Sequence, residues 1–140
     1  MRDADHKWQW LTCAKLSEVD RICNEARDLL NAYSLGSNCK FAVELLLREA
    51  LNNAVIHGSK NDPGKELKCE MEITPIEIIL KVIDQGPGFN WPAALAMKQH
   101  SVTETGRGIA VFQSYATSFT FNQSGNCITI RRAFATGERI

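Results

Sequence analysis

The sequence predicts a two-layer α/β (α+β) sandwich, in which helices cover one face of a mixed, mostly antiparallel sheet. Strands and helices come in runs along the chain rather than in strict alternation, as is typical of this class. Two segments with apolar residues at three- and four-residue steps come early, and a hairpin closes the chain. With 140 residues, the chain is expected to form a single domain over residues 1–140.

The expected elements follow from periodicity and turn residues. An edge strand with aromatic residues comes first, and Ser17 is a candidate cap for the helix after it. Segment 67–74 alternates apolar and charged residues, which predicts a half-buried strand, whereas segment 78–83 is nearly all apolar, which predicts a more fully buried one. The expected strands cover residues 8–13, 67–74, 78–83, 118–123 and 127–132, and the expected helices cover residues 17–32, 39–56, 92–98 and 108–116.

Composition narrows the class of protein. Sixteen basic and sixteen acidic residues cancel, which argues against direct binding to nucleic acid. Apolar runs fall short of the roughly 20 residues that span a bilayer, and the N-terminus is charged, so we expect a cytoplasmic protein without membrane contact. The five cysteines are scattered, a pattern that favours reduced, packing cysteines over disulfides or a zinc site.

The second expected helix carries a polar stripe. Glu49, Asn53 and His57 are spaced four residues apart, so their side chains fall on one side of the helix. A carboxylate one turn from a carboxamide can orient a hydroxyl for attack while the amide oxygen holds Mg²⁺. The alternative is a solvated helix face that ends in a polar cap.

A carboxylate followed by glycines ends the most apolar strand. Asp84 precedes Gly86 and Gly88, whose backbone can turn sharply and let a flat ligand approach closely. A carboxylate in such an apolar pocket can accept a hydrogen bond from the exocyclic amine of adenine. An ordinary glycine-proline turn is the alternative.

A second pair of glycines opens the expected helix 108–116. The first backbone N–H groups of a helix are unpaired and lie at the positive end of its dipole, which suits an anion. The segment of interest comprises Thr105, Gly106, Arg107, Gly108 and Ile109, and Arg107 adds positive charge. A plain glycine-rich helix entry is the alternative, and no lysine follows as in a P-loop.

Taken in order, the three motifs resemble those of the Bergerat-fold (GHKL) ATPases. A helical Glu-x-x-x-Asn, a post-strand Asp-x-Gly-x-Gly and a helix-opening Gly-x-Gly form the pattern shared by gyrase-type topoisomerases, heat-shock chaperones, mismatch-repair proteins and histidine kinases. The resemblance covers nearly the whole chain, and it implies the Bergerat ATP-binding fold with ATP and Mg²⁺ as ligands. It implies a general base at Glu49, a Mg²⁺ ligand at Asn53 and an adenine-reading carboxylate at Asp84.

The resemblance also assigns the glycine segments. Gly86 and Gly88 would shape the pocket floor, and residues Thr105 to Ile109 would contact the phosphates. Residues 90–104 would form a lid that is mobile until nucleotide orders it.

Within that group, the chain is similar to the small bacterial anti-sigma factors that are also serine protein kinases. The stretch 49–58, Glu-Ala-Leu-Asn-Asn-Ala-Val-Ile-His-Gly, is the closest local match. This branch implies a homodimer that sequesters a sigma factor and phosphorylates a serine of a STAS-type anti-anti-sigma partner. It also implies that Arg21 contacts the protein partner. The alternative, that Arg21 is only a solvated surface charge, fits the sequence equally well.

Two departures and two rival functions stay open. Asn126 follows the glycine of the closing hairpin where related proteins often have threonine, and Arg107 is a bulky residue between its two glycines. Intact motifs do not fix a phosphoryl-transfer rate, because that rate depends on positioning. The protein could instead be a non-catalytic nucleotide-sensing module, or a switch kinase or activator subunit of a phosphatase in stress signalling.

Overall fold

The computed structural model describes residues 6–87, 104–135 and 138, without the side chains of residues 104–108. Five strands form one sheet in the order β1-β2-β3-β5-β4, and all four pairings are antiparallel. In chain order the elements are β1 (His6–Cys13), α1 (Leu16–Asn31), α2 (Ser37–Asn53), the π-helical turn η1 (Ala54–Gly58), β2 (Glu66–Ile73), β3 (Glu77–Asp84), α4 (Glu104–Tyr115), β4 (Ser118–Phe121) and β5 (Cys127–Ala133).

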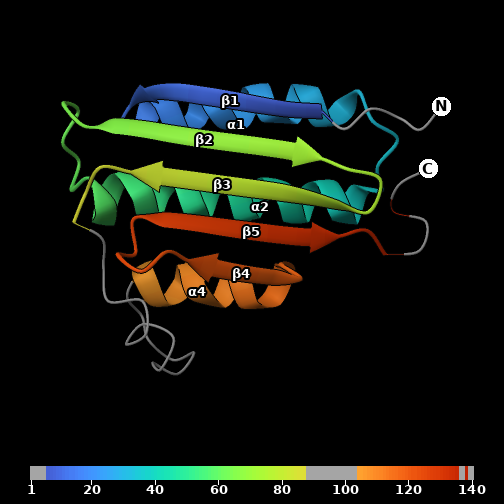
Figure 1. Ribbon diagram of the computed structural model, residues 1–140. Coiled ribbons are helices and arrows are strands. Elements are labelled where there is room, and N and C mark those ends of the chain that lie inside the picture. Colours follow the sequence, from blue (N-terminus) through green and yellow to red (C-terminus); the bar gives the residue numbers. More distant parts are fainter. Residues whose placement is uncertain (1–5, 88–103, 136–137, 139–140) are drawn as a thin grey trace.

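The helices α1, α2 and α4 lie behind one face of the sheet (Figure 1). This arrangement confirms the two-layer sandwich, and β1 lies at an edge of the sheet, as expected. The core lies between the layers, where the inward residues of β2 and β3 meet the buried faces of α1 and α2. On β2 these inward residues are Leu67, Cys69, Met71 and Ile73, which alternate with less buried charged residues as the sequence predicts.

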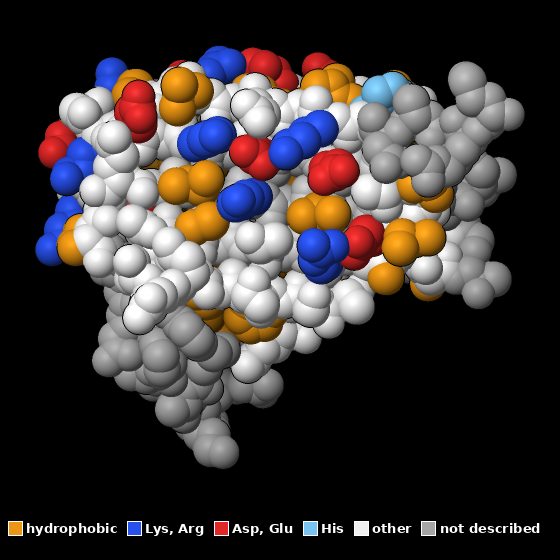
Figure 2. Space-filling model, in the orientation of Figure 1, with side chains coloured by type: hydrophobic (Ala, Val, Ile, Leu, Met, Phe, Trp, Pro, Cys, Tyr) orange, Lys and Arg blue, Asp and Glu red, His pale blue; other side chains and the backbone are white. Residues whose placement is uncertain are grey.

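The opposite face of the sheet carries no helix in the described part of the chain, and charged side chains of both signs are interspersed with apolar ones on it (Figure 2). Lys7 and Lys68 approach the carboxylate of Glu70 at 3.3 and 3.5 Å. Strand β3 also alternates, because Ile79 and Ile83 point to this open face and are only partly buried. The prediction of a more fully buried strand is therefore wrong: an apolar run in an antiparallel sheet can have one face open.

The helix boundaries differ from expectation in informative ways. Helix α1 begins at Leu16 with Lys15 at the cap position and without a side-chain cap bond, so the capping role expected of Ser17 is wrong. The hydroxyl of Thr12 instead hydrogen-bonds Glu18 in the first turn. Helix α4 begins four residues earlier than expected, at Glu104. The expected short helix at residues 92–98 lies outside the described residues.

Three of the predicted packing cysteines, Cys23, Cys39 and Cys69, are buried in the core. Burial raises the pKa of each of these thiols, which keeps them in the neutral form. Within the described ranges, no helix combines the length and the apolar character needed to cross a bilayer.

Candidate functional site

A pocket lies where the C-terminal ends of α2 and β3 meet α4 and the turn between β4 and β5. Of the predicted site residues, Asn53, Asp84 and Ile109 line it, so the structure brings three separate elements together at one place. Much of its wall is apolar, which suits a flat organic ligand. Among the described residues, the lining comprises Ala50, Asn53, Ala54, His57, Gly58, Val82, Asp84, Ile109, Phe112, Phe121, Gly125, Asn126, Cys127 and Ile128.

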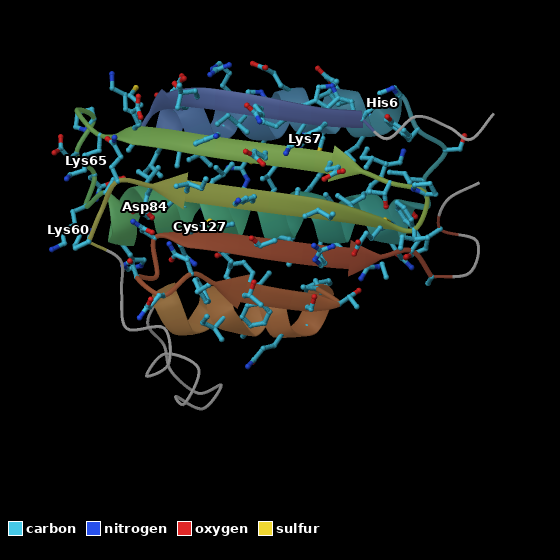
Figure 3. All side chains as sticks on the ribbon, viewed as in Figure 1. His6, Lys7, Lys60, Lys65, Asp84 and Cys127 are labelled. Atoms are coloured by element: carbon cyan, nitrogen blue, oxygen red, sulfur yellow. The ribbon has the colours of Figure 1, made fainter. Side chains whose placement is uncertain are left out.

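Asp84 is the buried charge of this pocket. It is the last residue of β3, and its side chain faces the helix layer like those of Val82 and Leu80 before it. Only 7% of the residue is exposed, and one carboxylate oxygen accepts the backbone N–H of Gly86 at 2.7 Å. Burial raises the pKa of this carboxyl, while the Gly86 N–H and the charge of Lys65 oppose the rise. In Figure 3, Asp84 lies at the same end of the sheet as Lys60 and Lys65.

Two glycines make room for this carboxylate. A Cβ atom on Gly58 would lie 2.2 Å from the Oδ2 atom of Asp84, and one on Gly86 would lie 1.7 Å from the carbonyl oxygen of Gly58. Both distances are far below van der Waals contact, so a side chain at Gly58 would have to displace the Asp84 carboxylate, and one at Gly86 would have to displace the backbone of Gly58. Gly86 was predicted as a site residue from the glycine motif. The role of Gly58 was not predicted, because it depends on a contact with a strand that lies further along the chain.

The end of α2 departs from a regular helix. After Asn53 the chain makes the π-helical turn η1, in which Ser59 N–H donates to the carbonyl of Ala54 at 2.7 Å. Lys60 and Asn61 then take the left-handed conformation, with φ of 54° and 59°. π-helical turns are rare in proteins, and those that do occur are often found at functional sites.

This turn changes the predicted polar stripe. Asn53 and His57 both line the pocket, whereas Glu49 does not. Glu49 lies one helical turn before Asn53 and is partly buried, and among the described residues its side chain makes no hydrogen bond or ion pair. The π turn adds an extra residue between Asn53 and the end of the helix, so the regular four-residue spacing ends at Asn53.

Helix α4 supplies the other wall through Ile109 and Phe112, which are 4% and 1% exposed. The backbone of Thr105, Gly106, Arg107 and Gly108 forms the first part of α4, and their side chains are outside the description. Gly88 and residues 90–103 of the predicted lid (90–104) also lie outside the described residues, whereas Glu104 is the first residue of α4. The phosphate-contacting role expected of the segment from Thr105 to Ile109 therefore stays a prediction.

The β4–β5 turn completes the pocket with Gly125 and Asn126. Asn122 organises this turn, because its side-chain oxygen accepts the backbone N–H groups of Gly125, Asn126 and Cys127 at 2.7, 3.0 and 3.2 Å. The sequence marks the turn by its Ser-Gly pair but gives no sign that it reaches the end of β3. That contact arises from the pairing of β5 with β3.

Arg21 lies on the exposed side of α1 and is not part of the pocket lining. Its guanidinium pairs with Glu18 at 2.9 Å and Glu25 at 2.8 Å on the same helix. Glu25 also accepts the indole N–H of Trp10 from β1 at 3.1 Å. Arg21 is therefore held in a defined position on the surface, three or four residues from each acidic partner.

The pocket chemistry fits the ligands that the motifs imply. A buried carboxylate can accept an amine N–H of a base, and the absence of a Cβ at Gly58 and Gly86 lets this carboxylate lie at the end of the pocket. The amide oxygen of Asn53 is a hard ligand, and Mg²⁺ commonly takes one or two protein oxygens together with phosphates and waters. A two-layer sandwich with this arrangement at the end of a central strand has the features of a Bergerat-type ATPase domain.

A family model described as the histidine kinase-like ATPase domain matches residues 12–132, and the chain belongs to this family. The match extends from β1 through β5 and includes every described wall of the pocket. No match was found among curated proteins.

Proposed function

We propose that the protein binds ATP with Mg²⁺ in this pocket and transfers the γ-phosphoryl group to a serine of a regulatory protein. The partner would be a STAS-type anti-anti-sigma factor, and the protein would also sequester a sigma factor. The observation that carries the proposal is the meeting of Asp84 from β3 and Asn53 from α2 in one pocket. These two residue types supply the base contact and the metal contact that ATP requires.

The adenine would lie against the apolar wall formed by Ile109, Phe112 and Phe121, with its exocyclic amine donating to Asp84. This contact would discriminate between bases, because a base without the exocyclic amine would leave the buried carboxylate without a hydrogen-bond donor. In this proposal the base lies at the β3 end of the pocket and the phosphates lie toward Asn53.

In the proposed reaction, Glu49 accepts the proton of the serine hydroxyl. The serine oxygen forms a bond to the γ-phosphorus, the bond between that phosphorus and the β-γ bridging oxygen breaks, and ADP leaves. Mg²⁺, held in part by Asn53, would neutralise charge on the phosphates. Glu49 suits the role of base because it lies one turn from Asn53 and forms no ion pair among the described residues.

The protein partners are proposed on the resemblance to the small anti-sigma kinases, together with the position of Arg21. Arg21 is held by Glu18 and Glu25 on the surface of α1 and is not among the residues that line the pocket. A partner that meets α1 would leave the pocket free for ATP. Phosphorylation of that partner would then weaken its binding by placing negative charge in the interface.

The test is transfer from labelled ATP to the candidate anti-anti-sigma partner by purified wild type, Glu49→Gln and Glu44→Gln. Glu44 is the matched control because it lies on the same helix but pairs with Arg27 of α1. We expect Glu49→Gln to bind ATP normally and to lose transfer by 100-fold or more, roughly the general-base contribution, while Glu44→Gln retains it. Equal transfer by wild type and Glu49→Gln would remove Glu49 from the reaction.

A non-catalytic nucleotide switch is the second candidate, because Glu49 is not among the residues that line the pocket. Such a protein would bind ATP through Asp84 and grip or release its partner without phosphorylating it; a phosphatase activator would use the same fold. The same assay separates the two functions. Absence of transfer by wild type, together with an ATP-dependent change in partner affinity, would favour the switch.

A further inference from the structure

The side chain of Asn126 connects the β4–β5 turn to the loop after β3. Its Nδ2 atom donates to the carbonyl oxygen of Gly86 in a long hydrogen bond of 3.4 Å. Its Oδ1 atom accepts from Asn122 Nδ2 at 2.6 Å, which fixes the orientation of the amide. The backbone carbonyl of Asn126 also accepts the N–H of Asp84 at 3.0 Å.

These bonds continue to the buried carboxylate. The N–H of Gly86 donates to Asp84 Oδ1 at 2.7 Å, so Gly86 is bonded to Asn126 through its carbonyl and to Asp84 through its N–H. The carbonyl oxygen of Gly58 also lies close to Gly86, since a Cβ on Gly86 would be 1.7 Å from it. Gly86 is thus in contact with both η1 and the β4–β5 turn.

We propose that Asn126 is a positioning residue for base selectivity: by holding Gly86, it fixes the direction in which the Asp84 carboxylate faces the pocket. The inference rests on the proposed reading of the base by Asp84. Direct contact of Asn126 with the base is less favoured, because both ends of its amide already have partners within the loops. Asn126 then acts on the ligand only through Gly86 and Asp84.

Loss of a residue that positions Asp84 should reduce the ability of the pocket to discriminate between bases. A hydrogen bond to a charged group changes affinity by about tenfold or more. Wild type should therefore bind ATP about tenfold more tightly than purine riboside triphosphate, which lacks the exocyclic amine. Without the Asn126 side chain the carboxylate loses its fixed direction, and we expect this ratio to fall toward one.

The matched control is Ser124→Ala. Ser124 lies on the same turn, is exposed, and makes no side-chain hydrogen bond among the described residues. Asn126→Ala is the first test variant, and Asn126→Ser is the second, because serine is common in turns but is too short to reach Gly86. Both Asn126 variants should lower the affinity ratio, and Ser124→Ala should preserve it.

The experiment measures the affinities of both nucleotides by calorimetry for wild type and the three variants. Loss of the ratio in the Asn126 variants alone supports the inference. An equal loss of affinity for both nucleotides, with the ratio preserved, overturns it, since this result would indicate a direct or merely structural role.

A measurement without ligand separates this inference from the proposed function. The N–H of Gly86 lowers the pKa of Asp84, so release of Gly86 should raise that pKa further. We expect an NMR titration of the Asp84 carboxyl to give a higher pKa in Asn126→Ala than in wild type and Ser124→Ala. If wild type does not discriminate between the nucleotides, base reading by Asp84 is wrong, and a role of Asn126 in base selectivity is wrong with it. If wild type discriminates but the pKa of Asp84 is unchanged in Asn126→Ala, the base reading stands and the positioning role of Asn126 is overturned.

Discussion

Gly58 and Asp84 are in such close contact that a single methyl group could not be placed between them. The Cβ position of Gly58 lies 2.2 Å from Asp84 Oδ2 and 2.6 Å from Asp84 Oδ1. The end of the helical layer therefore rests directly on the carboxylate that ends β3. This contact joins the segment that follows Asn53 to the proposed base-reading residue.

We expect Gly58→Ala to displace the Asp84 carboxylate and to weaken ATP binding. Overpacking of this kind costs about 1–3 kcal/mol of folding stability. Gly64→Ala is the matched control, because a Cβ there would meet only the exposed Asp62 at 3.2 Å. Calorimetry with ATP and urea unfolding would measure both effects. Equal affinity and stability in the two variants would contradict the contact.

The left-handed residues after η1 give a prediction about stability. Lys60 is exposed and has a φ of 54°, a conformation that costs a residue with a side chain about 1–2 kcal/mol. Lys60→Gly should therefore raise the free energy of unfolding by up to about 1 kcal/mol, after the entropy cost of glycine. Asn61→Gly should give a smaller gain, because asparagine adopts this conformation more readily. Urea unfolding measures both, and destabilisation by Lys60→Gly would refute the expectation.

The pKa of Asp84 predicts a pH dependence of stability. Burial raises this pKa above the ordinary value of 3.8, and the Gly86 N–H and Lys65 only partly offset the rise. Between the ordinary and the raised pKa, the folded state binds more protons than the unfolded state, so the free energy of unfolding falls as pH rises. The stabilisation of the folded state by proton binding at Asp84 is complete at pH values below 3.8. It is lost as the pH rises through the pKa that Asp84 has in the folded state.

This dependence is measured as the free energy of unfolding of wild type minus that of Asp84→Asn over a pH series. We expect the difference to decline as pH rises through the window, because the variant has no titrating group at this position. A difference that stays constant, or that grows with pH, would show that the carboxyl is not destabilised by burial.

From the surface position of Arg21, we predict that its substitution weakens partner binding and leaves the pocket unchanged. Its ion pairs with Glu18 and Glu25 are exposed, so Arg21→Ala should leave the thermal unfolding midpoint nearly unchanged. An arginine at the centre of an interface commonly contributes tenfold or more to affinity, so sigma-factor binding should weaken by about that factor. Arg27→Ala, on the same helix and paired with Glu44, is the control. Equal sigma-factor binding by the two variants would exclude Arg21 from the interface.

The sequence predicts the layers of this fold because periodicity determines which residues face the core. Alternation in β2 and the apolar steps of α1 and α2 correspond to buried faces in the structure. The π turn at Ala54–Gly58 has no such signature, since one inserted residue leaves the hydrophobic pattern of the helix before it unchanged. The predicted helix through residue 56 therefore ends differently.

The site was predictable where a motif carries polar residues and glycines, as at Asn53, Asp84 and Gly86. Phe112, Phe121 and Ile128 line the same pocket but read as ordinary core residues in the sequence. Asn122 and Asn126 act through the pairing of β5 with β3 and β4, which a single sequence does not specify. Contacts between distant segments were thus the part that only the structure supplied.

Binding of ATP through Asp84 is the central claim, and calorimetric titration of wild type, Asp84→Ala and Asp62→Ala with ATP and Mg²⁺ tests it most directly. Asp62 is an exposed carboxylate in the loop after η1 and serves as the control. We predict that wild type and Asp62→Ala bind ATP alike, and that folded Asp84→Ala shows no measurable binding. An unaltered affinity in Asp84→Ala would contradict the assignment of this pocket.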